Sequence, residues 1–221
     1  MEIAEKIKIR KKGEKDALRQ KIIDAARELF VRDGFESVSM RKIADTISYS
    51  PTAIYLHFSD KEALMREICR EDFGRLASEF NRIGRLEDPV EQVRAIGRAY
   101  IRFGVSNPNH YRLMFMTRHN VEPDQTDLEE MNDPSKDGYA FLRSCVARLI
   151  ELRLVKPEYA NVELTSQTLW ASVHGVTSLH VTHVDCPWIK LRPLRDRIEA
   201  IVMSTLDGML VQGKRRAGGA K

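Results

Sequence analysis

Apolar residues recur at intervals of three and four along most of the chain, which is the spacing that gives an α-helix one buried face. The first such segment carries Leu18, Ile22 and Leu29 and is followed by Gly34, which suits the left-handed end of a helix. Runs of alternating β-branched residues, the pattern typical of strands, are missing from the sequence. The pattern therefore predicts an all-α fold.

Two short helices are predicted next. Ser39 can cap the first, from about Met40 to Thr46, and Pro51 can begin the second, because a proline needs no N–H at the first helical position. Ile54 and Phe58, four residues apart, would face a core together. The second helix is only about two turns long, so its neighbours must hold it in place.

A longer helix is predicted after these two. Ser59 is a suitable N-cap for it, with Glu62 three residues later. Two short helices joined by the tight turn "ISYS" and braced by longer helices form a helix-turn-helix. In that motif the second helix enters the major groove of DNA, with its N-terminal residues near the base edges.

The outer face of the Pro51 helix offers hydroxyl, aromatic and methyl groups and no carboxylate, which would repel phosphates. Thr52 and Leu56 can contact thymine methyl groups, whereas Tyr55 and His57 can donate to phosphate oxygens. Lys61 would lie at the positive end of the following helix, where a phosphate also binds favourably. The predicted DNA-binding residues are Ser39, Arg41, Ser50, Pro51, Thr52, Tyr55, Leu56, His57 and Lys61.

Residues 22–64 resemble the DNA-binding head of the TetR family of transcriptional regulators. The stretch "IIDAARELFVRDGFESVSMRKIADTISYSPTAIYLHFSDKEAL" contains, in order, Ala-x-x-Leu-Phe, Gly-Phe, Ser-x-Arg-x-Ile-Ala, Tyr-x-His-Phe and Lys-Glu-x-Leu. The family usually has glycine where Ser48 stands, and a left-handed serine costs about 1 kcal/mol relative to glycine. The resemblance implies a homodimer on a roughly palindromic DNA operator, with a small-molecule pocket in the C-terminal domain that controls DNA affinity.

The remaining helices are expected at about Ser59–Phe80, Asp88–Phe103, Tyr111–Met116, Tyr139–Ile150, Glu163–Val184 and Pro193–Val211. The polar, acidic stretch between Thr117 and Gly138 contains prolines and is predicted to be a long loop. These elements divide the chain into a basic flexible arm (1–15), a helix-turn-helix domain (16–64), a C-terminal ligand-binding and dimerisation domain (65–213) and a disordered tail (214–221). The last two helices are predicted to form the dimer interface.

Composition fits a cytoplasmic protein. The net charge of +4 is modest, and its excess of basic residues lies within the N-terminal arm. The three cysteines are far apart, so neither a disulfide framework nor a metal-binding CxxC pattern is predicted. No apolar run approaches the roughly 20 residues of a membrane span, and the N-terminus lacks the apolar centre of a signal peptide.

The stretch "LWASVHGVTSLHV" resembles a TetR subgroup with a Trp-x-x-x-His-Gly element, here Trp170, His174 and Gly175. Its small residues favour a core and dimer-interface helix, while a ligand-facing role for Trp170 and His174 remains open. The predicted ligand-binding residues are Tyr100, Phe103, Met114, Phe115, Trp170 and His174. They carry few charges, so the small-molecule effector is expected to be largely apolar, although Arg102, Arg112 and Arg118 leave room for an acidic group.

His180 and His183 in "HVTHVDC" make a metal site conceivable, but the spacing matches no familiar site and favours surface or interface histidines. Catalytic and nucleotide motifs such as GxSxG, HExxH and GxGxxG are missing, so we predict no catalytic residue, cofactor or metal. The sequence therefore predicts a ligand-responsive DNA-binding regulator, a repressor released from its operator by a small molecule. The alternative is an all-helical small-molecule carrier or enzyme without operator binding.

Overall fold

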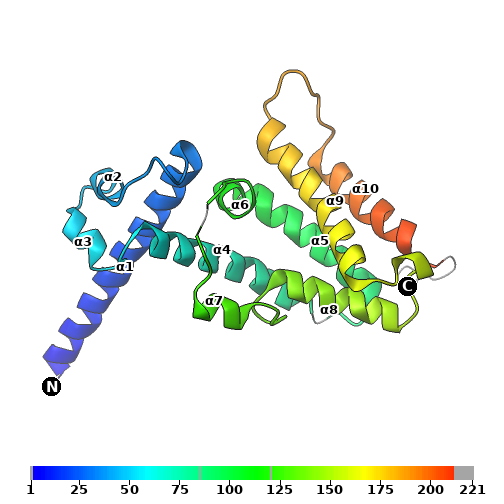
Figure 1. Cartoon of the computed structure of the whole chain (residues 1–221), viewed down its shortest axis with the longest axis horizontal. Helices are drawn as coiled ribbons and strands as arrows, with labels where there is room; N and C mark the ends of the chain where they lie inside the picture. The colour runs from blue at the N-terminus through cyan, green and yellow to red at the C-terminus, as the bar shows by residue number, and fades with distance from the viewer. Residues whose placement is uncertain (1, 85, 120, 212–221) are drawn as a thin grey trace. The chain divides into compact units, whose positions relative to one another are not determined.

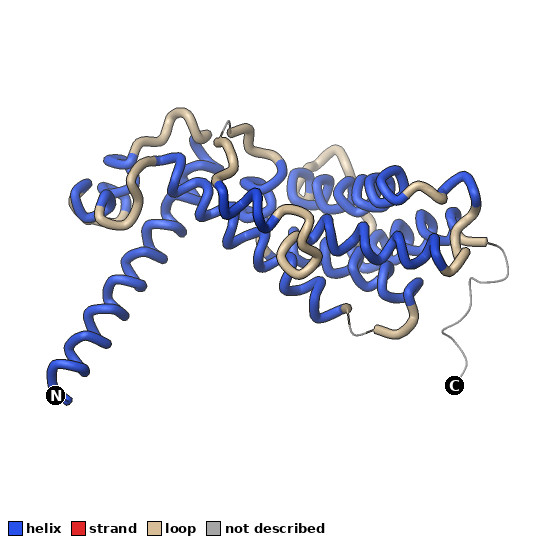
Figure 2. The backbone as a smooth tube through the Cα atoms, turned by 60° about the horizontal axis from the view of Figure 1, so that its bottom comes forward, coloured by secondary structure: helices blue, strands red, loops and turns tan. Residues whose placement is uncertain are grey.

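The computed structural model describes residues 2–84, 86–119 and 121–211; near the N-terminus it describes the side chains of residues 5, 10 and 12 onward. The helices are α1 (Glu2–Asp33), α2 (Met40–Thr46), α3 (Pro51–Tyr55), α4 (Lys61–Ile83), α5 (Pro89–Ser106), α6 (Pro108–Phe115), α7 (Gln125–Glu130), α8 (Gly138–Glu151), the 3-10 helix η1 (Pro157–Tyr159), α9 (Val162–His183) and α10 (Leu194–Met209) (Figure 1). The described part contains no strand, only an isolated β-bridge between Val155 and Leu210 (Figure 2). The predicted all-α fold is confirmed.

The chain separates into two compact units. Unit 1 comprises residues 1–72 and 109–123, and unit 2 comprises residues 73–108 and 124–221. Unit 1 therefore contains α1 to α3, the first half of α4 and most of α6. Unit 2 contains the rest of α4 together with α5 and α7 to α10.

Unit 1 is built around one cluster of buried apolar side chains. Ile22 of α1, Ile43 of α2, Ile54 of α3 and Leu64 of α4 are fully shielded from solvent, and Leu113 of α6 belongs to the same cluster. Helices of seven and five residues would not persist alone, so this shared core is what stabilises α2 and α3. The three-helix head predicted from the sequence is present.

Two boundaries near α3 differ from expectation. Helix α3 ends at Tyr55 and has five residues, fewer than the two turns predicted. The cap of α4 is Asp60 and not Ser59: Asp60 Oδ1 accepts from the Ala63 N–H at 2.6 Å, and the Ser59 hydroxyl donates to Asp60 Oδ2 at 2.8 Å. A carboxylate accepts a stronger hydrogen bond than a hydroxyl and is also stabilised by the positive end of the helix. Asp60 therefore caps α4 in place of Ser59.

Helix α1 begins at Glu2, so residues 2–15, expected as a flexible arm, are helical here. The segment is rich in Glu, Lys and Arg, which are good helix formers. Arg10 also pairs with Glu14 one turn later, with 3.5 Å between Nε and Oε1. The helix propensity of these residues therefore extends α1 toward the N-terminus, beyond the amphipathic segment from which this helix was predicted.

Helix α9 packs against α5, α8 and α10 in unit 2. Its buried side carries Leu169, Val173 and Val181. Ion pairs tie α5 to α10, with Arg98 Nη2 lying 2.8 Å from Glu199 Oε2. The two last predicted helices are confirmed within two residues as α9 and α10.

In unit 2 one expected helix start agrees with the structure, and one predicted loop does not. Asp88, where a helix was expected to begin, is the cap of α5, because its Oδ1 accepts from the Val90 N–H at 2.8 Å. The stretch predicted as a long loop contains α7, which begins with a reciprocal capping box between Asp124 and Asp127, so that prediction is wrong over six residues. The predicted disordered tail, 214–221, lies outside the described residues.

Among the helices that are described, none has both the length and the apolar character needed to cross a bilayer.

Candidate nucleic-acid interface

Hydroxyl caps begin both short helices of the head. Ser39 Oγ accepts from the Lys42 N–H at 3.2 Å, and Ser50 Oγ accepts from the Ala53 N–H at 3.2 Å. Both serines lie on the surface, so each hydroxyl hydrogen remains available to a phosphate oxygen. Capping therefore holds two of the predicted contact residues in a defined place.

The turn between α2 and α3 contains a left-handed residue. Ser48 has φ 59°, a conformation that costs a side chain with a Cβ more than glycine. Backbone hydrogen bonds hold the turn, with the Tyr49 N–H donating to the Ala44 carbonyl at 3.0 Å. The turn therefore carries the local strain that the sequence suggested for this position.

The outward side of α3 is open to solvent. The Leu56 side chain is 75% exposed and that of Tyr55 54% exposed, and Thr52 is also exposed. Ile54 on the opposite side is fully buried, so the core fixes the rotation of the helix. An exposed leucine and threonine beside a hydroxyl-bearing aromatic ring provide both methyl and hydrogen-bonding groups for a base edge.

His57 and Lys61 are less free than the sequence suggested. His57 is half-buried and its Nδ1 has no hydrogen-bond partner among the described residues. Burial lowers the pKa of His57, and the nearby charges of Lys15 and Arg19 lower it further, so the ring is neutral near pH 7. Lys61 Nζ donates to the Phe35 carbonyl at 2.9 Å and lies 4.3 Å from the centre of the Phe35 ring. Two N–H groups of this ammonium remain for another acceptor.

Two further residues bear on this surface. Arg41 is exposed at the start of α2, as a phosphate contact requires. Tyr49, 40% exposed in the turn before α3, was not among the predicted contacts. Its signal in the sequence was a hydroxyl-bearing aromatic residue within the turn "ISYS", next to the cap Ser50.

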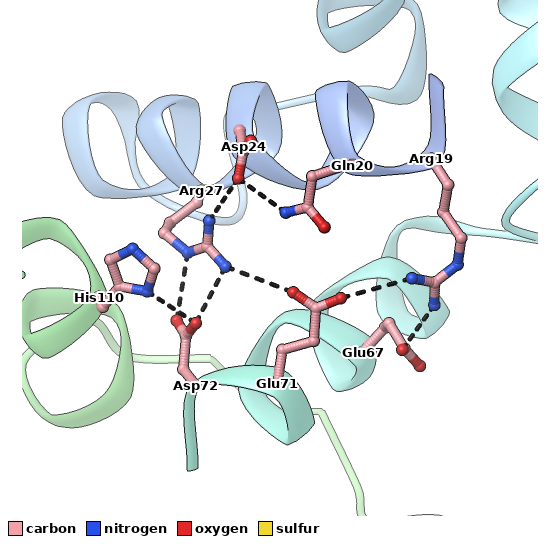
Figure 3. Close-up of polar contacts among 8 residues, drawn as sticks. All are labelled: Arg19, Gln20, Asp24, Arg27, Glu67, Glu71, Asp72 and His110. Carbon is pink, nitrogen blue, oxygen red and sulfur yellow. Dashed lines mark hydrogen bonds and ion pairs between the residues drawn. The ribbon is translucent and has the colours of Figure 1, made fainter. Parts of the chain in front are cut away.

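A buried charge network connects α1, α4 and α6 within unit 1 (Figure 3). Arg27 of α1 meets Asp72 of α4 through two contacts, Nη2 to Oδ1 at 2.9 Å and Nε to Oδ2 at 3.2 Å. His110 of α6 places its Nδ1 2.7 Å from the same Asp72 Oδ1. Arg27 is 4% exposed and Asp72 is fully buried, so both charges depend on their partners. The network therefore joins α1, α4 and α6 within unit 1.

Three of the predicted ligand-binding residues come together in unit 2. The Tyr100 hydroxyl lies 3.0 Å from His174 Nδ1 and accepts from Trp170 Nε1 at 3.2 Å. Burial lowers the pKa of His174, so its ring is neutral at pH 7 and can accept the tyrosine proton. Trp170 also packs against Tyr139, with 5.7 Å between ring centres. This cluster joins α5, α8 and α9.

The structure separates the rest of that set. Phe103 is buried on α5 in unit 2, whereas Met114 and Phe115 belong to α6 in unit 1. Phe115 packs against the buried Tyr111, with 5.2 Å between ring centres. The six predicted residues therefore do not form a single cluster within one unit.

Two stretches of the chain match models of known families. Residues 22–68 match "Bacterial regulatory proteins, tetR family", and residues 93–213, more than half of the chain, match "Tetracyclin repressor-like, C-terminal domain". The chain belongs to the TetR family. The resemblance drawn from residues 22–64 is confirmed, and the TetR head coincides with the helix-turn-helix described above.

Curated proteins are similar to this TetR chain mainly in the head. The transcriptional repressor AcnR of Corynebacterium diphtheriae is 42% identical over 59 residues, which is 27% of this chain and 31% of AcnR. The transcriptional regulator UidR of Escherichia coli (strain K12) is 36% identical over 78 residues, 35% of this chain and 37% of UidR. The chain thus matches about a third of the length of these relatives.

Solved structures of TetR type are similar over most of the chain. A TetR family transcription regulator from Marinobacter aquaeolei VT8 has a TM-score of 0.74 at 18% identity, covering 90% of this chain and 98% of that one. The fatty acid degradation regulator FadR from Bacillus halodurans has a TM-score of 0.67 at 19% identity, covering 86% and 95%. At such identities the similarity shows a shared TetR fold.

Proposed function

We propose that this TetR protein is a transcriptional regulator that binds a DNA operator through α3 and leaves it when a small, largely apolar molecule binds. The observation that carries the proposal is the outward face of α3, where Thr52, Tyr55 and the C-cap residue Leu56 are exposed while Ile54 fixes the helix to the core. Membership of a family of regulatory proteins disfavours the alternative of a helical carrier or enzyme. The proposal places the protein in the cytoplasm, where a bacterial regulator of this kind meets its DNA.

Contacts to DNA divide by chemistry. Thr52 and Leu56 face the bases, because their methyl groups suit thymine and the threonine hydroxyl can bond to a base edge. Ser39, Arg41, Tyr55 and His57 face phosphates together with Ser50 and Lys61, and these contacts set the register without reading sequence. Pro51 begins α3 and fixes its direction.

Dimerisation belongs to the same proposal, because one five-residue recognition helix offers too few contacts for a long operator. Helix α9 presents Leu164 and Leu179, 53% and 47% exposed, at the two ends of a stripe that includes the small residues Ala171 and Gly175. A Cβ added at Gly175 would touch nothing within 4 Å, so the stripe leaves room for a second helix. Two copies joined there would bind a roughly palindromic site with half-sites one helical turn, about 34 Å, or a multiple apart.

The effector is proposed to act on the aromatic cluster of unit 2. Trp170 is 36% exposed, so it offers an apolar surface, while Tyr100 and His174 behind it supply a hydroxyl and an imidazole. Assignment to the subgroup with Trp-x-x-x-His-Gly rests on the stretch "LWASVHGVTSLHV", which supplies Trp170 and His174 of this cluster. Phe103, Met114 and Phe115 remain candidates, and α4, which contributes to both units, is the element through which their positions can reach the head.

Footprinting on DNA flanking the protein's own gene tests the proposal. The expected result is a protected, roughly palindromic site whose affinity falls linearly on a log–log plot as salt rises, because each phosphate contact releases counterions. The matched control is the same DNA with both half-sites scrambled, which should show only weak binding. If the protein bound the operator and the scrambled DNA with equal affinity at low salt, it would not be an operator-binding regulator.

A further inference from the structure

A hollow of about 440 Å³ lies in unit 2, where the end of α9 and the start of α10 meet the loop between them. This loop connects α9 to α10 at one end of the helix pair (Figure 1). Aliphatic side chains, Val184, Ile189, Leu191 and Leu194, form part of its lining. The volume lies within the range of ordinary small-molecule sites.

The polar part of the lining has one sign of charge. Lys190, Arg192 and Arg197 contribute three basic side chains, and none of the described residues that line the hollow is acidic. The structure records no ion pair between described residues for any of these three side chains. Three cations without a carboxylate among them form a positive potential that an anion would relieve.

Arg197 is held in position by its own chain. Its Nε donates to the Arg192 carbonyl at 3.0 Å, and its Nη2 donates to His180 Nδ1 at 3.0 Å. A guanidinium carries five N–H donors in a fixed plane, so donors remain on the fork for a ligand. A donor group fixed in advance costs little ordering entropy on binding.

We propose that this hollow binds a small amphipathic anion, a carboxylate or a phosphate ester that carries an aliphatic chain. The head group pairs with Arg197, Arg192 and Lys190, and the chain lies against Ile189 and Leu191. An inorganic anion would leave the aliphatic lining unused, whereas an uncharged chain would leave the cations unpaired.

The site is distinct from the aromatic cluster proposed for the effector. Trp170 and His180 are ten residues apart on α9, which corresponds to about 15 Å along the helix axis. The inference stands on the hollow and its charges alone, so it does not depend on operator binding.

Calorimetric titration of the full-length protein with octanoate tests the proposal. Octanoate and octyl phosphate should bind, and octanol and octylammonium, which have the same chain, should bind at least about tenfold more weakly. Arg197→Gln should weaken octanoate at least about tenfold, because it removes a charged hydrogen bond. Arg195→Gln, an exposed cation nearby on α10 that does not line the hollow, is the matched control and should bind octanoate like the wild type.

A second readout locates the ligand. Trp188 is 89% exposed in the loop next to Ile189, so octanoate should shift its fluorescence in a Trp170→Phe background, where it is the remaining tryptophan. Equal affinity for octanoate and octanol, or equal affinity of the Arg197→Gln and Arg195→Gln variants, would overturn the proposal. Sulfate binding as tightly as octanoate would do so as well. Dissociation of a dimer by Arg197→Gln, seen in sedimentation, would assign these residues to a subunit interface and also refute the site.

Discussion

Ser48 holds a left-handed conformation with φ 59° in the turn that joins α2 and α3. Glycine adopts this region without steric cost, whereas a side chain with a Cβ is strained there. Ser48→Gly should therefore raise the free energy of unfolding by up to about 1 kcal/mol, measured by urea denaturation. Ser48→Ala keeps the Cβ and is the control. A Ser48→Gly protein less stable than Ser48→Ala would contradict this account of the turn.

Specificity for an operator should reside in Thr52 of α3 and in its C-cap residue Leu56, which are both exposed. Thr52→Ala and Leu56→Ala should each reduce discrimination between the operator and random DNA by about 1–3 kcal/mol, because they remove contacts to base edges. Fluorescence anisotropy on both DNAs over a salt series gives the measurement.

Arg41→Ala is the contrasting variant, since Arg41 is exposed and faces phosphates in the proposal. It should weaken binding to both DNAs alike and reduce the salt slope by about one. Lys61 is a poorer choice, because its ammonium also donates to the Phe35 carbonyl. If Leu56→Ala lost affinity equally on operator and random DNA, α3 would not read the bases.

At the scale of elements, the short helices were predictable because their signals are local. Ser39 acts on an N–H three residues away, and Pro51 begins α3 directly, so chain order alone indicates where both helices start. The cap of α4 was not predictable in this way, because Ser59 and Asp60 are both suitable caps and the sequence does not show which of them reaches the free N–H. In the structure it is Asp60.

Contacts between distant residues were not predictable in this way. Asp72 is 45 positions from Arg27 and 38 from His110, and no spacing rule joins them. The candidate ligand set shows the same limit. Its six residues were grouped because they are aromatic or carry little charge. The fold brings Tyr100, Trp170 and His174 together, whereas Met114 and Phe115 belong to the other unit.

The Arg27–Asp72 pair supplies a prediction about how α1 and α4 are joined. Asp72→Asn leaves the Arg27 charge buried with weaker partners, so the free energy of unfolding should fall by roughly 3 kcal/mol. The double variant Arg27→Met/Asp72→Leu removes both charges and should recover most of that loss.

Chemical denaturation of both variants gives the measurement. Glu79→Gln serves as control, because its pair with Arg82 is exposed and should matter by less than about 0.5 kcal/mol. If the double variant were no more stable than Asp72→Asn, the loss would not come from an unpaired buried Arg27 charge, and this prediction would be wrong.

At the scale of the whole molecule, the apolar stripe of α9 predicts a dimer at micromolar concentration. Leu164→Lys or Leu179→Lys would place a charge in the interface and should shift the sedimentation coefficient toward that of a monomer. Leu128→Lys is the matched control, since Leu128 on α7 is 52% exposed and lies outside the stripe. Dissociation by all three variants alike would argue against α9 as the interface.

Regulation requires that the effector bind one state of the protein better than the other, and a coupling of about 1–3 kcal/mol changes operator affinity by roughly five- to 150-fold. Trp170→Ala removes the exposed ring and its hydrogen bond to Tyr100, so it should abolish release of DNA by a compound selected from a thermal-shift screen. Phe115→Ala tests the α6 candidate in the same way. Ligand-free operator binding should stay intact in both, because neither residue belongs to the head surface. Trp188→Ala, the other tryptophan, is the control: it lies beside the α9–α10 hollow, so loss of release in this variant alone would move the effector from the aromatic cluster to that hollow.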